Sequence, residues 1–309
     1  MSEATTSFSE GYNNPMGQGF SNFGSKSALD GSKEFLMSNT LVAKLAFLLL
    51  VIIVFFLLLR ILIQIIVWWN QPDPNPYLVT CRRDGERSLE ISSNPKMTDS
   101  VPILRSKDER TGPEFTWSLW VFVKSPHHAE QGHPAYYHVF HKGTKATTGV
   151  LSKINHDVAP GLYIKAEQDS EGNIRNSLVS VINTFKGDVG KNFDGLEKET
   201  VLENIPFGKW IHVAIRLENK NFDTYINGIL AKRRTLQSLP RQNYGNTHIS
   251  QAGSLDGSTG FKGEISSLRY FNSALNPVEI NSITNSGPNM CADDSTKQYP
   301  PYFSQRWYL

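Results

Sequence analysis

Acidic residues alternate at one place in the chain, and carboxylate pairs are the groups that cleave glycosidic bonds. Glu167, Asp169 and Glu171 occupy alternate positions in the segment EQDSE. Cleavage with retention needs two carboxylates about 5–5.5 Å apart, and alternate residues on one strand face could supply that spacing. Turn-forming residues surround these acids, which favours a solvated loop. We therefore expect no catalytic residues and no enzyme activity.

Five histidines form a second cluster, and imidazoles are ligands for zinc and copper. They are His127, His128, His133, His138 and His141. His138 and His141 are three residues apart on a predicted strand, so the alternation of side chains predicts that they face opposite sides of the sheet. No HExxH motif is present. The pattern favours a polar loop beside a strand over a metal site.

A short basic run, Lys232, Arg233 and Arg234, follows the dipeptide Asn227-Gly228. It could contact an anionic ligand such as a phosphate, a lipid headgroup or an acidic glycan. Charges also protect edge strands from association, and the pattern favours that interpretation. The net charge of +2 gives no general attraction to nucleic acid, so no nucleic-acid partner is expected.

One segment is apolar enough to cross a membrane. Every residue from Leu45 to Leu59 is apolar, and the run resumes after Arg60 as far as Trp69. Fourteen strongly apolar residues favour insertion by about −4 to −8 kcal/mol, against a cost of about +3 kcal/mol for Arg60. The sequence predicts a single-pass transmembrane helix over 41-69, with the lipid bilayer as a partner. Basic residues flank both ends, so charge does not decide which side carries the rest of the chain.

The flanking segments differ in composition. Residues 1-40 are rich in Ser, Gly and Asn, which predicts a disordered polar tail. Residues 70-76 read NQPDPNP, typical of an extended Pro-rich spacer. Residues 77-309 then form the predicted globular domain.

The globular part has the two-residue period of β-strands. In Phe115–Val123, every second residue from Phe115 to Val123 is apolar and is predicted to point to the same face. Asn227-Gly228 separates two strand candidates and predicts a tight hairpin. The other strand candidates are Tyr137–His141, Leu162–Ala166, Leu178–Asn183, Trp210–Leu217, Phe222–Ile226, Ile229–Thr235 and Glu264–Phe271. Many short strands with Gly, Pro and Asn between them predict an all-β sandwich or jelly roll.

One helix is predicted near the C-terminal end. Asn276 can cap it, Pro277 suits its first position, and Glu279 completes a capping box. Gly287 lies just past its expected end.

Three stretches in combination carry a family resemblance: EFTWSLWVFV (114–123), IPFGKWIHVAIRL with FDTYINGILAKRRTL (205–217 and 222–236), and FKGEISSLRYFNSALNPVEI (261–280). They resemble the laminin-G-like, concanavalin A-like jelly rolls. The resemblance implies a concanavalin-like β-sandwich after the transmembrane helix. Trp210 starts one of the strands and is expected to plug the edge of the sandwich.

The resemblance also bears on metals and cysteines. Related domains bind calcium with oxygen ligands at the sandwich rim, and four aspartates fall in loop-like stretches: Asp157, Asp188, Asp194 and Asp256. None fits a pattern residue by residue, so no cofactor is expected, with calcium as the alternative. The first and last strands of the resembled fold lie together, so Cys81 and Cys291 could form a disulfide. The alternative is two unrelated reduced cysteines.

A narrower resemblance rests on the anchor, the spacer, RSKDERTGPEFTWSLWVFV and the aromatic end PPYFSQRWYL. Together they look like membrane-anchored proteins of large DNA viruses of algae and protists. This implies a virion internal membrane or a host-derived membrane, with a capsid or other virion protein as partner.

The leading functional expectation is a non-catalytic, membrane-anchored recognition or structural module. A lectin that binds a glycan is the alternative, and a glycoside hydrolase is a weaker one. An exposed aromatic residue beside Asn or Asp at the sandwich rim would favour the lectin. A broad apolar patch would favour contact with a protein.

Overall fold

The computed structural model describes residues 33, 40–97, 99–106, 112–130, 132–144, 158–185, 200–250 and 260–292. The chain divides into two compact units, Met1–Gln71 and Pro72–Leu309, each described by itself. Most of the predicted polar tail and the aromatic C-terminal end lie outside the described residues.

The first unit contains one long helix, α3, over Leu41–Asn70. Thr40 caps its start, because the Thr40 hydroxyl accepts a hydrogen bond from the Ala43 amide at 3.3 Å. Thirty helical residues extend about 45 Å, more than the hydrocarbon thickness of roughly 30 Å. By length and composition α3 is a candidate membrane span.

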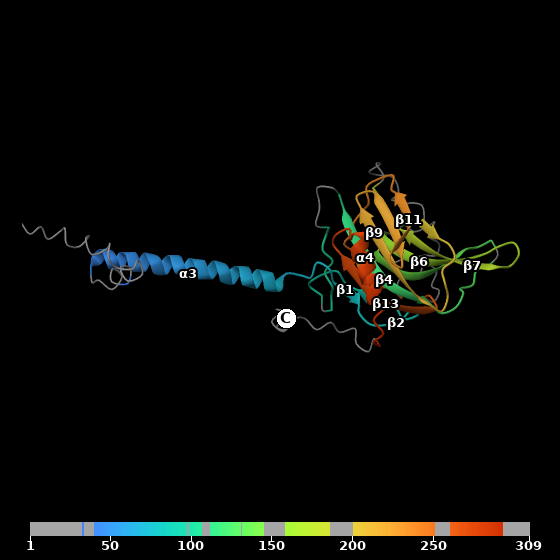
Figure 1. Cartoon of the computed structure of the whole chain (residues 1–309), viewed down its shortest axis with the longest axis horizontal. Coiled ribbons are helices and arrows are strands. Elements are labelled where there is room, and N and C mark those ends of the chain that lie inside the picture. The colour runs from blue at the N-terminus through green and yellow to red at the C-terminus, as the bar shows by residue number, and fades with distance from the viewer. Residues whose placement is uncertain are drawn as a thin grey trace, which may run out of the picture. The chain divides into compact units, whose positions relative to one another are not determined.

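The second unit is a sandwich of two antiparallel sheets (Figure 1). The 7-stranded sheet has the order β1-β13-β4-β9-β10-β11, with β2 also paired to β13. Its strands are β1 (Tyr77–Val79), β2 (Arg83–Asp84), β4 (Glu114–Val123), β9 (Trp210–Glu218), β10 (Asn221–Ile226), β11 (Ile229–Thr235) and β13 (Gly263–Phe271).

The 6-stranded sheet has the order β3-β12-β5-β6-β7-β8. Its strands are β3 (Leu89–Ile91), β5 (Ala135–Gly143), β6 (Val158–Gln168), β7 (Ile174–Val181), β8 (Thr200–Leu202) and β12 (Asn246–Ile249). The predicted concanavalin-like β-sandwich is confirmed.

Alternation along β4 builds the core between the sheets. Phe115, Trp117 and the apolar residues that alternate with them as far as Val123 are all buried in the main core cluster. The Trp117 ring lies 5.3 Å from the ring of Phe140 on β5, centroid to centroid, so it joins the two sheets. The predicted inward face of this strand is confirmed.

Trp210 does not fill the core, and the expectation that it plugs the sandwich edge was wrong. Its side chain is half-buried and its ring centroid lies 5.5 Å from that of Phe122. Trp210 is opposite Phe122 in the β4–β9 register. Since Phe122 points away from the core by alternation, its partner lies on the same outer face.

The expectation that His138 and His141 face opposite sides of the sheet was also wrong. The pairing of β5 with β6 shifts register between His138 and Phe140. A bulge adds one residue and changes the phase of the alternation beyond it. His138 and His141 therefore lie on the same face, with Nε2 and Nδ1 2.8 Å apart.

The predicted hairpin and helix are both confirmed. Asn227 and Gly228 have φ values of 49° and 81°, as the type I′ turn between β10 and β11 requires. Helix α4 spans Pro277–Ser286 with Asn276 as N-cap, a full capping box through Glu279, and Gly287 as C-cap.

His212 attaches α4 to the 7-stranded sheet. Its Nε2 lies 2.8 Å from Ser118 Oγ, and its Nδ1 lies 2.8 Å from Thr284 Oγ1 on α4. The Thr284 hydroxyl donates its proton to the Ile280 carbonyl. His212 Nδ1 must therefore donate to Thr284, which leaves Nε2 to accept from Ser118. Burial lowers the pKa of His212 to about 4, in keeping with a neutral ring.

Candidate ligand-binding hollow

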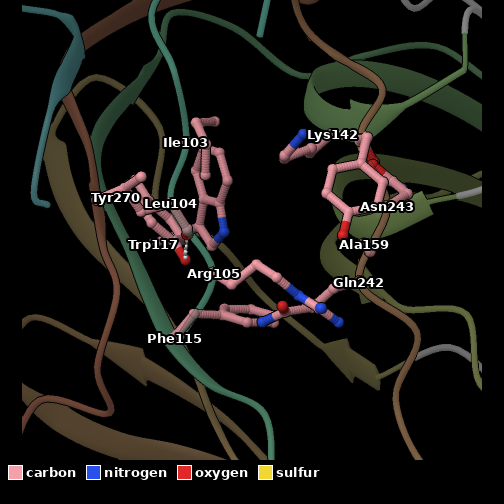
Figure 2. Close-up of a pocket in the computed structure, with 11 residues that line it drawn as sticks. Ile103, Leu104, Arg105, Phe115, Trp117, Lys142, Ala159, Gln242, Asn243 and Tyr270 are labelled. Carbon is pink, nitrogen blue, oxygen red and sulfur yellow. Dashed lines mark hydrogen bonds between the residues drawn. The ribbon is translucent and has the colours of Figure 1, made fainter. Parts of the chain in front are cut away.

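A small hollow opens at the end of the sandwich where β4 begins and β5 and β13 end. It has a volume of about 30 Å³, room for one or two waters or a single functional group. Figure 2 shows its lining, with Lys142 reaching in opposite Ile103 and Trp117. The lining residues are Ile103, Leu104, Arg105, Phe115, Trp117, Lys142, Ala159, Gln242, Asn243, Tyr244 and Tyr270.

Lys142 is the unusual member of this set, because it is a buried cation at the end of the core. Its side chain is 6% exposed, and it follows the core residue Phe140 by two positions on β5. Nζ donates to the Gly245 carbonyl at 2.6 Å and to Ser93 Oγ at 3.4 Å. Burial lowers the pKa of Lys142 to about 8, so the ammonium form still dominates at neutral pH.

The loop before β12 forms one wall and is fastened to the end of β5. Asn243 Nδ2 donates to the Lys142 carbonyl at 3.1 Å, while its Oδ1 accepts from the Gly245 amide at 3.2 Å. A Cβ on Gly245 would lie 2.4 Å from the backbone of Gly143, so only glycine permits this close approach. The loop thereby holds Tyr244 at the mouth of the hollow with its side chain 78% exposed.

The opposite wall comes from the 7-stranded sheet and the segment before β4. Tyr270 Oη donates to the Leu104 carbonyl at 2.7 Å, which positions the neighbouring Arg105. The Arg105 guanidinium lies 6.0 Å from the Tyr244 ring centroid, within the range of a cation–π contact. Arg105 and Tyr244 therefore lie together at the hollow.

The chemistry of the hollow is that of a hydrogen-bond donor site. Lys142 and Arg105 bring two cations, and the Trp117 indole nitrogen turns toward the open centre in Figure 2. None of the described lining residues is acidic. Such a site can bind an oxygen-rich or anionic group, but it offers no carboxylate pair for hydrolysis.

Two of the EQDSE acids, Asp169 and Glu171, lie in the turn between β6 and β7, as predicted, whereas Glu167 lies on β6 opposite Arg175. Asp169 Oδ1 accepts from the amides of Glu171 and Asn173 at 3.0 and 2.8 Å. These hydrogen bonds, led by that from the Asn173 amide, lower the pKa of Asp169. Glu167 is exposed on β6 and forms an ion pair with Lys165, so the prediction of a loop position was wrong for this residue.

The other predicted site residues are spread over the unit. The four calcium candidates, Asp157, Asp188, Asp194 and Asp256, lie outside the described residues. Among the residues that are described, no group of three or more His, Cys, Asp or Glu side chains is arranged to hold a metal ion.

The basic run lies on β11, at the edge of the 7-stranded sheet. Arg233 makes a bidentate ion pair with the buried Asp223, at 2.7 and 2.8 Å. Asp223 also accepts from Arg216 at 3.0 Å, and Lys232 Nζ donates to the Val201 carbonyl at 3.0 Å. The run thus has internal partners, and an anionic ligand there would have to compete with Asp223.

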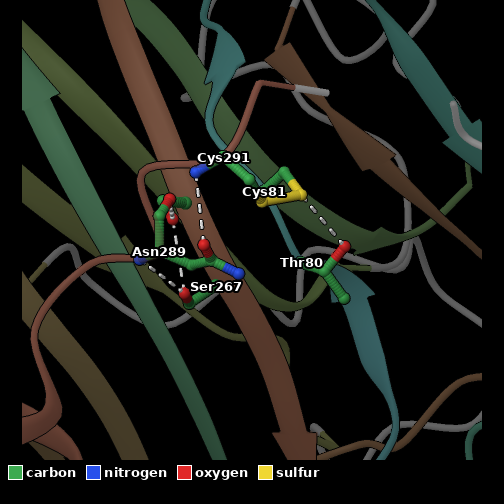
Figure 3. Close-up of a disulfide and its surroundings, with 6 residues drawn as sticks. Thr80, Cys81, Ser267, Asn289 and Cys291 are labelled. Carbon is green, nitrogen blue, oxygen red and sulfur yellow. Dashed lines mark hydrogen bonds between the residues drawn. A yellow bond between two sulfur atoms is a disulfide. The ribbon is translucent and has the colours of Figure 1, made fainter. Parts of the chain in front are cut away.

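Cys81 and Cys291 are joined by a disulfide, with Cα atoms 5.0 Å apart (Figure 3). The Arg82 amide donates to the Cys291 carbonyl at 2.8 Å. Asn289 Oδ1 accepts from the Cys291 amide, and Ser267 Oγ accepts from the Asn289 amide. The bridge therefore ties the segment after α4 to the segment after β1, beside β13.

Sequence reasoning missed Lys142, Arg105 and Tyr244. The signal for Tyr244 was an aromatic residue inside the polar loop QNYGN. Alternation along the strand did not predict that Lys142 faces the core, because the bulge in β5 changes which residues point inward. Arg105 lies in an irregular segment, where no periodicity of the sequence predicts the direction of its side chain.

Comparisons with known proteins find solved structures with limited similarity to the chain. The binding domain of botulinum neurotoxin serotype G matches with a TM-score of 0.40 and 15% identity, over 66% of this chain and 46% of that one. The serotype C1 binding domain matches with a TM-score of 0.36 and 16% identity, over 56% of this chain and 36% of that one. The binding domain of type DC in complex with rat synaptotagmin II matches with a TM-score of 0.34 and 17% identity, over 56% of this chain and 35% of that one. The aligned region thus spans less than half of each of these structures.

No curated protein sequence matches the chain. The sequence profile of the concanavalin A-like lectin/glucanases superfamily matches residues 98–281. That segment runs from before β4 into α4 and includes both walls of the hollow. With its two antiparallel sheets and a profile match over more than half of its length, the chain belongs to the concanavalin A-like lectin/glucanases superfamily.

Proposed function

We propose that the protein is a membrane-anchored, non-catalytic glycan-recognition module. The observation that carries this proposal is Tyr244, which is 78% exposed beside Asn243 at the mouth of a donor-lined hollow. An aromatic ring with a polar tip offers a flat apolar surface next to hydrogen-bonding groups, which suits a sugar ring. The arrangement favours a lectin over contact through a broad apolar patch.

The non-catalytic part of the proposal is supported by the lining of the hollow. Glycoside hydrolysis depends on a general acid and a second carboxylate. The described lining residues contribute cations, amides and aromatic rings in place of carboxylates. The ligand would therefore be bound and released unchanged.

The test is a glycan array probed with the full-length protein in phosphatidylcholine nanodiscs. We expect binding to a defined set of glycans, strongly weakened in Tyr244→Ala and retained in Tyr77→Ala, a matched loss of another exposed tyrosine. The same glycans should show no new reducing ends after incubation. Absence of binding to every glycan, or turnover that depends on one acidic residue, contradicts the proposal.

We further propose that α3 anchors the protein in a virion internal membrane or a host-derived membrane, where the second unit could also contact a capsid or another virion protein. The apolar composition of Leu41–Asn70 supports the anchor, and the viral resemblance of the flanking segments supports the location. Resistance to alkaline carbonate extraction tests the anchor. Detection of the chain by mass spectrometry in purified virus particles tests the location, and its absence there contradicts it.

A further inference from the structure

We propose that the hollow selects glycans that carry a carboxylate, with Lys142 and Arg105 as the residues that recognise the acidic group. This inference rests on the proposed glycan-binding function and deepens it. It follows from the number, burial and direction of the donors around the hollow.

Lys142 has a hydrogen-bond donor to spare. An ammonium group carries three donors, and Lys142 uses two of them on Gly245 and Ser93. Both of these acceptors are neutral, so its charge has no anionic partner among the described residues. Since the third donor is left for the hollow, an acceptor that enters it meets a charge held in a poorly solvated place, where electrostatic attraction is stronger than in water.

Arg105 supplies the second cation at the entrance. Among the described residues its guanidinium lies over the Tyr244 ring and forms no hydrogen bond or ion pair, so its five donors are available to a ligand. Arginine binds carboxylates with two parallel hydrogen bonds. A carboxylate could therefore accept from Lys142 with one oxygen and from Arg105 with the other.

The size of the hollow and its rim point to an acidic sugar. A volume of about 30 Å³ admits a carboxylate but not a whole sugar ring. The ring would remain outside, where Tyr244 offers an exposed aromatic face. A uronic-acid residue presents this combination, a compact acidic group attached to a ring with an apolar face.

The experiment compares two ligands that differ only in the acidic group. The full-length protein in phosphatidylcholine nanodiscs is titrated with a tetrasaccharide that ends in glucuronic acid and with the same tetrasaccharide ending in glucose. We expect the acidic ligand to bind at least tenfold more tightly. Lys142→Met and Arg105→Gln should each bring its affinity down toward that of the neutral ligand.

Lys124→Met is the matched control, because it removes an exposed lysine just beyond the far end of β4. That position is roughly 30 Å along the strand from Phe115. The control should leave both affinities unchanged. Thermal unfolding of each variant establishes that the domain is folded, and Arg105→Gln, an exposed substitution, keeps the test valid if Lys142→Met is unstable.

Three outcomes would contradict the selection of carboxylates by the hollow. They also distinguish a failure of this inference from a failure of the proposed glycan-binding function. Equal affinity for the two tetrasaccharides refutes carboxylate selection while glycan binding stands. No binding to either ligand, or to any glycan on the array, removes both proposals. Binding to phosphatidylserine vesicles that is lost in Lys142→Met, without glycan binding, would assign the hollow to a lipid headgroup.

Discussion

His138 Nε2 and His141 Nδ1 lie 2.8 Å apart on the 6-stranded sheet, although the two residues are three positions apart on one strand. His138 Nδ1 also bonds to the Ser250 carbonyl, and His141 Nε2 bonds to the Thr144 carbonyl. A carbonyl can only accept, so the outer nitrogens donate in these two hydrogen bonds. The bulge in β5 thus brings the two rings together on one face of the sheet, and backbone carbonyls hold their outer nitrogens.

Trp117 and Trp210 are predicted to differ in their effect on stability. Trp117 is 1% exposed in the core, whereas Trp210 is half-buried on the outer face. Trp117→Ala should lower the free energy of unfolding by about 3–5 kcal/mol, the usual cost of removing a buried aromatic side chain. Trp210→Ala should cost less than half as much. Chemical denaturation of both variants measures the difference, and equal losses would contradict the burial that we describe.

The comparison of these two tryptophans shows what the sequence could predict. Alternation along β4 correctly predicted its inward residues, and the capping residues correctly predicted α4, because both signals are local. The direction of Trp210 also follows from alternation along β9, where Ile211, Val213 and Ile215 face the core, so the expectation that Trp210 plugs the edge overlooked a local signal. The bulge in β5 and the position of Arg105 come from long-range contacts, which no local signal specifies.

The protein is predicted to lose stability in mild acid. Burial lowers the pKa of both His127 and His212 from 6.5 to about 4. The unfolded chain therefore binds more protons than the folded one between pH 6.5 and pH 4, and the free energy of unfolding falls as the pH falls through that window. Each histidine contributes up to about 3 kcal/mol to this loss.

Denaturation curves between pH 7 and pH 4 measure this acid dependence. His212→Gln should be less stable at pH 7 but should show a shallower dependence on pH. His133 is exposed, so His133→Gln should retain the dependence of the wild-type protein. A wild-type stability that stays constant down to pH 4 would be inconsistent with neutral, buried histidines.

The disulfide is predicted to stabilise the second unit. It closes a loop with a sequence separation of 210 residues, for which the chain-entropy argument gives up to about 5 kcal/mol. The double substitution of Cys81 and Cys291 by serine should lower the free energy of unfolding toward that limit. Reduced wild-type protein should match the double variant, and unchanged stability on reduction would show that the thiols are not bonded.

Burial of the Lys142 ammonium is predicted to lower the free energy of unfolding at neutral pH. Its pKa falls from 10.5 to about 8 on burial, a difference of about 3 kcal/mol in favour of the unfolded, charged lysine at neutral pH. Lys142→Met removes this cost but leaves the Gly245 carbonyl without its donor, at about 1–3 kcal/mol. We expect a net change between about 0 and 2 kcal/mol in the stabilising direction at pH 7.

The pH dependence separates the contribution of the charge from that of packing. Because the folded pKa lies below the unfolded one, the wild-type free energy of unfolding should rise between pH 8 and pH 10.5, as both states come to hold a neutral amine. The methionine variant lacks this group and should show a smaller rise, so the advantage of the variant should shrink or reverse by pH 10. Binding of the glucuronic-acid ligand to wild-type protein should weaken over the same rise in pH, since the ammonium is the recognising form. If Lys142→Met is instead strongly destabilised at pH 7 and parallel to wild type at every pH, Lys142 acts through packing alone.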